Sequence, residues 1–239
     1  MGNAQNQGMR GGGLAVRIDE ATSSLFSDCL KAFHAFIDLD QLAEDLRILS
    51  LNAELAAGRA GDRGRAVRAL TQYTRALVSR LASVQGDILH VRSDTYINSA
   101  KALNELFFLR QFERAALACR GGEEDNQAKD ALEKAQGQVL EQLRKAIANM
   151  LKDVAILSER TNQVLEVVSQ SGSSIATNIA VEAASAGQYE IELRTVAQTM
   201  RRYVDMLREI GDKANSAIRS ATRSGQALQS LASGRTKHG

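Results

Sequence analysis

The sequence predicts an all-α protein: a long antiparallel four-helix coiled-coil bundle made of two tandem hairpins. Three observations favour this fold. The 239 residues include no Pro, which breaks helix interiors and makes up roughly 5% of an average chain. Apolar residues recur at alternating spacings of three and four, which is typical of coiled coils. Signals that end helices are few, so the helices between them are expected to be long.

Turn signals rich in Gly divide the chain into four helical segments. The signals lie at residues 57–64, 120–126 and 186–188. The segments they separate are 14–58, 65–119, 126–185 and 190–232. Helices of this size are about 65–90 Å long at 1.5 Å per residue. Because short turns join antiparallel neighbours and the middle two segments are nearly equal in length, both hairpin tips are expected at the same end.

Each segment carries one apolar stripe that is expected to be buried. The stripe of the first segment is Phe26, Cys29, Phe33, Phe36, Ala43, Leu46 and Leu49. The stripe of the second is Leu70, Tyr73, Leu77, Leu81, Val84, Ile88, Val91, Leu103, Leu106 and Phe112. The stripe of the third is Leu132, Val139, Leu143, Ala146, Met150, Val154, Leu157, Val164, Val168 and Ile175. The stripe of the fourth is Leu193, Val196, Met200, Tyr203, Leu207, Ile210, Ala214, Ala217, Ala221, Ser224, Leu228 and Leu231.

The predicted organisation is two hairpins between polar ends. In chain order we expect a disordered leader, a first hairpin, a turn, a second hairpin and a disordered tail, at residues 1–13, 14–119, 120–126, 127–232 and 233–239.

Charge and hydropathy exclude several classes of protein. With 30 basic and 28 acidic residues, the formal net charge of +2 indicates no nucleic-acid partner. No apolar stretch approaches the roughly 18 residues of a membrane span. Residues 1–13 lack the apolar core of a secretion signal. We therefore expect a cytoplasmic protein without membrane insertion, in which Cys29 and Cys119 stay reduced.

The two expected tips are related in sequence. The first reads Asn-Ala-Glu-Leu-Ala-Ala-Gly-Arg-Ala-Gly over residues 52–61, and the second reads Asn-Ile-Ala-Val-Glu-Ala-Ala-Ser-Ala-Gly over residues 178–187. Asn52 and Asn178 are 126 residues apart, which is eighteen heptads, so both occupy the same phase of the coiled coil. The matching position at both tips favours an internal duplication.

Both tips resemble the cytoplasmic signalling hairpin of methyl-accepting chemotaxis proteins, the bacterial chemoreceptors. That family's tip reads Asn-Ala-Ala-Val-Glu-Ala-Ala-Arg-Ala-Gly, followed by Glu-x-Gly-Arg-Gly-Phe. The first tip shares Asn52, Ala53, Ala57, Arg59, Ala60, Gly61, Gly64 and Arg65. The second tip shares Asn178, Ala180, Val181, Glu182, Ala183, Ala184, Ala186 and Gly187. The resemblance covers about 30 residues at each tip, and the stems match in heptad character alone.

Each tip departs from the family pattern at one of its two charges. Ala56 stands where the family has Glu in the first tip, and Ser185 stands where it has Arg in the second. Each repeat therefore keeps one charge, Arg59 or Glu182, and we expect this pair to act within one chain or between copies of it. The family uses its tip to bind a histidine kinase and a coupling protein, and to join receptor dimers. Such a dimer is itself a four-helix bundle of two hairpins, which this chain resembles in fused form.

The sequence contains no pattern of residues that indicates catalysis or a cofactor. His34, His90 and His238 are scattered, and they lack the further ligands that a zinc site requires. A phosphate-binding loop needs a preceding strand, and no segment shows strand alternation. We therefore expect a protein that is not an enzyme and holds neither metal nor cofactor.

The resemblance implies a soluble, chemoreceptor-like signalling or scaffold protein of a bacterial chemotaxis-type pathway. Its partners would be a chemotaxis histidine kinase, a coupling protein, chemoreceptors or its own copies. The candidate partner-binding residues at the tips are Asn52, Arg59, Asp62, Arg65, Asn178, Glu182 and Gln188. Two alternatives stay open: a structural coiled-coil rod that self-assembles, and a helical sensor bundle with a small ligand near His34 and His90.

Overall fold

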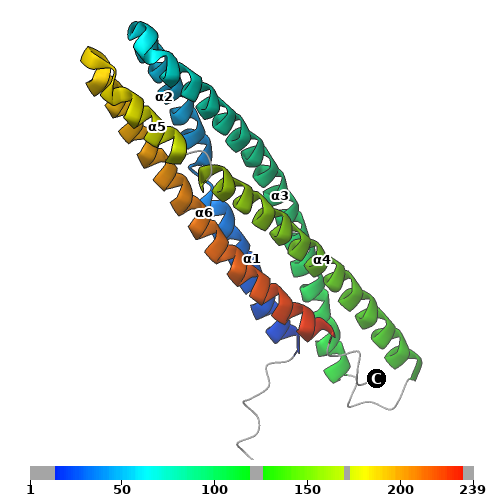
Figure 1. Ribbon diagram of the computed structural model, residues 1–239. Helices are drawn as coiled ribbons and strands as arrows, with labels where there is room; N and C mark the ends of the chain where they lie inside the picture. Colours follow the sequence, from blue (N-terminus) through cyan, green and yellow to red (C-terminus); the bar gives the residue numbers. More distant parts are fainter. Residues whose placement is uncertain (1–13, 119–125, 170–172, 234–239) are drawn as a thin grey trace, which may run out of the picture. The chain divides into compact units, whose positions relative to one another are not determined.

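The structure is a computed structural model that describes residues 14–118, 126–169 and 173–233 (Figure 1). The α-helices are α1 (Leu14–Ala35), α2 (Leu39–Arg59), α3 (Arg65–Ala118), α4 (Asn126–Val167), α5 (Ser173–Ala184) and α6 (Glu190–Ser233). Two 3₁₀ helices, η1 (Gly61–Gly64) and η4 (Gly187–Tyr189), form the turns between α2 and α3 and between α5 and α6. No strand occurs in these ranges, so the predicted all-α class is confirmed.

Several predicted features lie outside the described residues. They are the leader at 1–13, residues 119–125 of the turn region, Cys119, His238 and the tail from residue 234.

The first predicted segment is not one helix, because a tight turn at Phe36–Asp38 separates α1 from α2. In this turn the amide of Phe36 donates to the carbonyl of Phe33, and the amide of Leu39 donates to the carbonyl of Phe36, both at 3.1 Å. Such three-residue spacing keeps side chains at i and i+3 on one face. The turn therefore buries Phe33, Phe36 and Leu39 together, which a continuous α-helix would not do.

The third predicted segment, 126–185, is also interrupted. Helix α4 ends at Val167, Val168 and Ser169 form a π-helical turn, and α5 begins at Ser173. The hydroxyl of Ser169 donates to the carbonyl of Glu166 at 3.0 Å. Ser169, Ser173 and Ser174 stand where α4 has ended and where α5 begins, and Ser is a weak helix former because its side chain bonds to nearby backbone groups.

The chain divides into two compact units, each with segments from both predicted hairpins. Unit 1 comprises Met1–Leu30, Arg92–Ala155 and Ile218–Gly239. Unit 2 comprises Lys31–Val91 and Ile156–Ala217. Helices α1, α3, α4 and α6 contribute to both units, because the boundaries fall inside them.

Neighbouring helices run antiparallel within each unit. In unit 2 the ends of α2 and α5 and the starts of α3 and α6 share one buried cluster, so the two tips lie at the same end, as predicted (Figure 1). In unit 1, Thr95 and Ser99 of α3 bond to Asp153 and Met150 of α4 respectively, so residue numbers rise along one helix while they fall along the other. These contacts confirm the antiparallel four-helix arrangement.

Helix α3 buries a continuous seam with a spacing of three and four, but the seam differs from the predicted stripe. Polar residues occupy several of its positions, among them Thr71, Thr74 and Thr95, each at most 3% exposed. The stripe predicted Tyr73 and Leu103 to be buried, and this was wrong: they are 63% and 47% exposed. A pattern that counts only apolar residues does not recognise threonine as a core residue, so it placed the exposed Tyr73 in the stripe instead of the buried Thr74 beside it.

A buried polar group joins α3 to α4 in unit 1. Asp153 is 7% exposed, and its Oδ2 accepts hydrogen bonds from Asn98 Nδ2 at 3.0 Å and from Thr95 Oγ1 at 3.3 Å. Burial raises the pKa of the Asp153 carboxyl, and these two hydrogen bonds offset part of the rise. Nearby, burial and then the Asp153 and Asp28 carboxylates raise the pKa of the Cys29 thiol to about 12, which leaves it an unreactive thiol at neutral pH.

We expect Asp153→Asn to stabilise the protein at neutral pH. The folded carboxyl binds its proton more tightly than the unfolded one, whose pKa is about 3.9. The free energy of unfolding therefore falls as pH rises from about 4 through the raised folded pKa. Asparagine keeps an oxygen acceptor for Asn98 and Thr95 without the buried charge. A gain of about 1 kcal/mol would raise the melting temperature by roughly 2–4 °C at pH 7, and less at pH 4.

The control is Asp212→Asn on the exposed face of α6. It should leave the melting temperature nearly unchanged at both pH values. A lower melting temperature for Asp153→Asn than for the wild type at pH 7 would contradict the expectation.

Candidate functional site at the hairpin tips

The two tips turn in the same way at the same point of the repeat. Gly61 and Gly187 are 126 residues apart, and they adopt left-handed φ angles of 61° and 63°. No other residue described has a positive φ. Glycine is favoured here because a Cβ atom is disfavoured in this region of backbone space. The relation that the sequence predicts between the tips thus extends to their backbone conformation.

Small side chains pack the two tips against each other. The buried cluster consists of Ala56, Ala57, Val67, Ala183, Ala186 and Leu193, with Tyr189 partly buried beside it. Because the side chain of alanine is small, helices that pack through alanines can bring their backbones close together. Within the first tip the backbone also folds closely on itself, since a Cβ added at Gly64 would lie only 2.1 Å from the carbonyl oxygen of Ala57.

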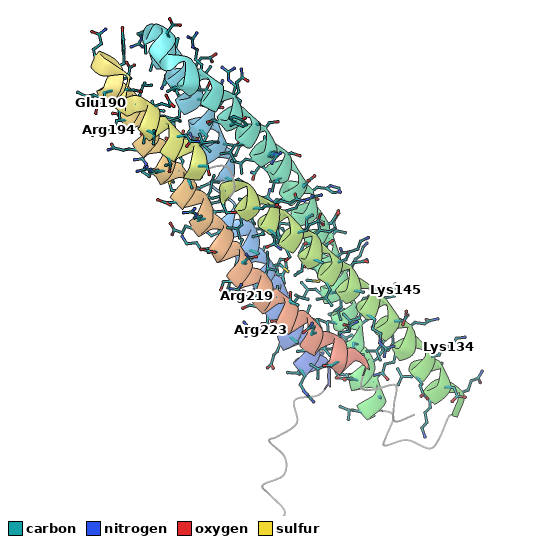
Figure 2. The ribbon with its side chains drawn as sticks, in the orientation of Figure 1. Lys134, Lys145, Glu190, Arg194, Arg219 and Arg223 are labelled. Carbon is teal, nitrogen blue, oxygen red and sulfur yellow. The ribbon has the colours of Figure 1, made fainter. Side chains whose placement is uncertain are left out.

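Ion pairs surround this cluster. Arg59 Nη1 at the end of α2 lies 2.9 Å from Glu192 Oε1 on α6, which connects the first tip to the second. Figure 2 shows Glu190 and Arg194 at the start of α6, where they also form an ion pair. The Arg59 and Glu192 side chains are 60% and 40% exposed. An ion pair this exposed contributes at most about 1 kcal/mol to folding. Because both side chains reach the surface, their charges are accessible to a partner.

The predicted pair Arg59 and Glu182 is not formed within the chain, since Arg59 contacts Glu192 instead. Glu182 is half-buried on α5, where its backbone carbonyl accepts from the Ser185 amide and hydroxyl. Asn178, one α-helical turn earlier on α5, is exposed.

The remaining predicted site residues lie at or near the two turns. Asn52 is exposed on α2, Asp62 is exposed in η1, and Gln188 is exposed in η4. Arg65 begins α3, and its side chain lies outside the described residues. Among the predicted partner-binding residues, Arg59 pairs with Glu192, which was not among those predicted.

A groove of about 490 Å³ lies beside the tips between α2 and α6. Its lining residues are Asp45, Ile48, Leu49 and Asn52 from α2, and Glu192, Thr195, Val196, Thr199 and Tyr203 from α6. Only Asn52 was among the predicted site residues. The others were missed because the adjacency of α2 and α6, more than a hundred residues apart, depends on the topology of the bundle.

Apolar side chains stand exposed around the tips and this groove. On α2 they are Ile48, Leu51 and Leu55, whose spacing of three and four places them along one face. On the second hairpin they are Val181 and Ile191, which is 80% exposed. Exposed apolar residues gathered near a groove are characteristic of protein contact surfaces. The sequence signal was the lack of a charged residue at these positions of an otherwise polar helix face.

A second, smaller cavity of about 270 Å³ lies between α3 and α4 in unit 2. Its lining includes Arg80, Leu81, Val84, Gln163 and Val164. His34 and His90, near which one of the alternative readings placed a small ligand, are exposed and line neither cavity described here.

In the described ranges, no three His, Cys, Asp or Glu side chains come together in a way that could hold a metal ion. None of the helices described combines the length and apolar character needed to cross a membrane.

No protein-family model and no curated protein matches this chain. Inference of function therefore rests on the geometry of the tips and on the motif that both tips carry.

Two glycine substitutions should separate tip packing from helix propensity. Gly64→Ala forces a Cβ against the Ala57 carbonyl, so it should lower the melting temperature, with a loss of about 1–3 kcal/mol. Gly58→Ala places its Cβ where no atom lies within 4 Å and improves a helical position, so it should be neutral or stabilising by up to about 1 kcal/mol. Equal effects of the two variants in thermal unfolding would contradict the close approach.

Proposed function

We propose that this chain is a chemoreceptor-like signalling or scaffold protein that acts through protein–protein contacts at its hairpin tips. The observation that carries the proposal is the joint tip surface. Two sequence-related turns pack around one alanine cluster and present exposed charges beside a groove with a mixed apolar and polar lining. Protein interfaces combine apolar and polar residues in the same way.

The kind of partner follows from the motif that the tips resemble. In chemoreceptors this segment contacts a histidine kinase and a coupling protein, and it joins neighbouring receptors. We therefore propose a chemotaxis-type pathway in the cytoplasm, with a kinase, a coupling protein or a chemoreceptor as partner. No catalytic step is proposed, and the tips would act by positioning partners relative to each other.

The first test is Arg59→Glu in a pull-down from the native host, with retained proteins identified by mass spectrometry. The substitution reverses the charge at position 59 and places it beside Glu192, which has the same sign. The charge pattern of the tip surface is thereby changed, so the variant should no longer retain a chemosensory partner. The melting temperature should change little, because an exposed pair is worth at most about 1 kcal/mol.

The matched control is Arg208→Glu, a similarly exposed arginine on α6 that pairs with Asp205. This variant should retain the same proteins as the wild type. Retention of the same chemosensory proteins by Arg59→Glu, or retention of none by the wild type, would argue against the proposal.

The second test concerns the apolar residues of the tip surface. Ile191→Asp should weaken partner binding by at least about tenfold, because a central apolar anchor commonly contributes more than 1 kcal/mol. Ile37→Asp is the control, since Ile37 is also an exposed isoleucine of unit 2, at 63%, and lies in the turn between α1 and α2. Titration calorimetry with the purified partner would measure both, and an equal loss of affinity would contradict a specific tip surface.

A further inference from the structure

An unpartnered apolar stripe runs along α3 in unit 1, away from the tips. Tyr96, Leu103 and Phe107 are spaced by seven and four, so they follow a coiled-coil seam, with the exposed Ala100 completing it. Ile97 and Phe108 flank this seam. These five large side chains are between 43% and 55% exposed. Helix α3 thus has two seams: one buried in the bundle, and one facing outward.

The stripe is large enough for a reversible interface. A large apolar or aromatic side chain carries on the order of 200 Å², so five that are about half exposed present on the order of 500 Å². Two copies would together bury about 1,000 Å², which is the lower range of specific protein interfaces. When the largest exposed apolar patch of a protein has about this size, it is often a functional surface.

The chain's own contacts cover only about half of each side chain in the stripe. Tyr96 meets Phe26 of α1 edge-on at 5.9 Å between ring centroids, and Phe107 meets Phe108 at 5.7 Å. The sequence segments outside the described residues are rich in Gly and polar residues, with Met1–Gly13 holding only two Met and one Ala as apolar residues. Such segments have no apolar stripe to place on this one.

We infer that this stripe binds the same stripe of a second copy of the chain, in antiparallel orientation. Layers of Phe107 against the partner's Tyr96, and of Leu103 against the partner's Ala100, fill a seam of large and small residues in alternation. Charge favours the antiparallel orientation. A parallel pair would stack Arg114 on the same residue of the partner and would bring together the two Arg110 side chains, each of which pairs with Asp19 of its own chain. An antiparallel pair instead moves Arg110 toward Ser93 at the opposite end of the stripe.

Sedimentation velocity of the full chain over a concentration series tests the dimer. The wild type should shift from monomer to dimer as concentration rises, and Phe107→Glu should raise the dissociation constant at least about tenfold. Phe107 is exposed, so the variant should melt at the wild-type temperature. Tyr73→Glu, an exposed aromatic residue of the same helix in unit 2, should dimerise like the wild type.

The result that overturns the inference is a monomer at all concentrations up to about 1 mM. Equal loss of dimer in Phe107→Glu and Tyr73→Glu would overturn it as well. Dimer loss in Arg59→Glu but not in Phe107→Glu would place self-association at the tips instead. The inference is independent of the proposed tip function, because each has its own variant and readout.

Disulfide crosslinking tests the orientation, in a Cys119→Ser background. In the antiparallel register Ser93→Cys of one copy lies opposite Arg110→Cys of the other, so only a mixture of the two variants should crosslink. Arg110→Cys alone would have its partner cysteine about 25 Å away along the axis, and a disulfide needs Cα atoms within about 7 Å. Crosslinking of Arg110→Cys with itself would overturn the antiparallel orientation.

Discussion

Burial of one seam per helix, with a spacing of three and four residues, is the constraint on which the other features depend. On α3 this seam includes Val67, Leu77, Leu81, Leu106 and Leu109, and all are at most 2% exposed. At the tips the same seam is continued by alanines, so the helices approach until backbone atoms meet. The left-handed glycines form the two turns, and Gly64 leaves room for the Ala57 carbonyl within the first turn. At the tips the charged residues Arg59 and Glu192 remain outside, where they form an exposed pair and can meet a partner.

Much of the fold could be predicted from the sequence, because its signals are local. The turns after Gly61 and Gly187 follow from glycine chemistry and the repeat. The turn at residues 36–38 was missed because no Gly or Pro marks it. It depends on burying apolar residues spaced by three, which is a tertiary effect. The interruption after Val167 had a Ser- and Gly-rich signal that the apolar period concealed.

The candidate site could be predicted only in part. The sequence motif identified Asn52, which lines the groove, and Arg59, which forms the ion pair that joins the tips. Within the chain Arg59 pairs with Glu192 rather than Glu182, because motif register does not say which helices become neighbours. Glu192 lies on α6, and its contact with α2 exists only once both hairpins close at the same end. Leu103, which belongs to the exposed stripe of α3, was mistaken for a core residue, since threonines take several of the buried positions of α3.

The asymmetry between the repeats has a physical explanation in the tip packing. Ala56 and Glu182 occupy equivalent positions 126 residues apart, yet Ala56 is fully buried and Glu182 is half exposed. A glutamate in place of Ala56 would put a carboxylate among alanines without a partner, at a cost of several kcal/mol. Gly64 likewise corresponds to Glu190, whose side chain pairs with Arg194, so at this position only the first turn requires a residue without Cβ. Both tips contribute alanines to the cluster, but the first is packed more closely at these two positions, and the second retains an acidic residue at both.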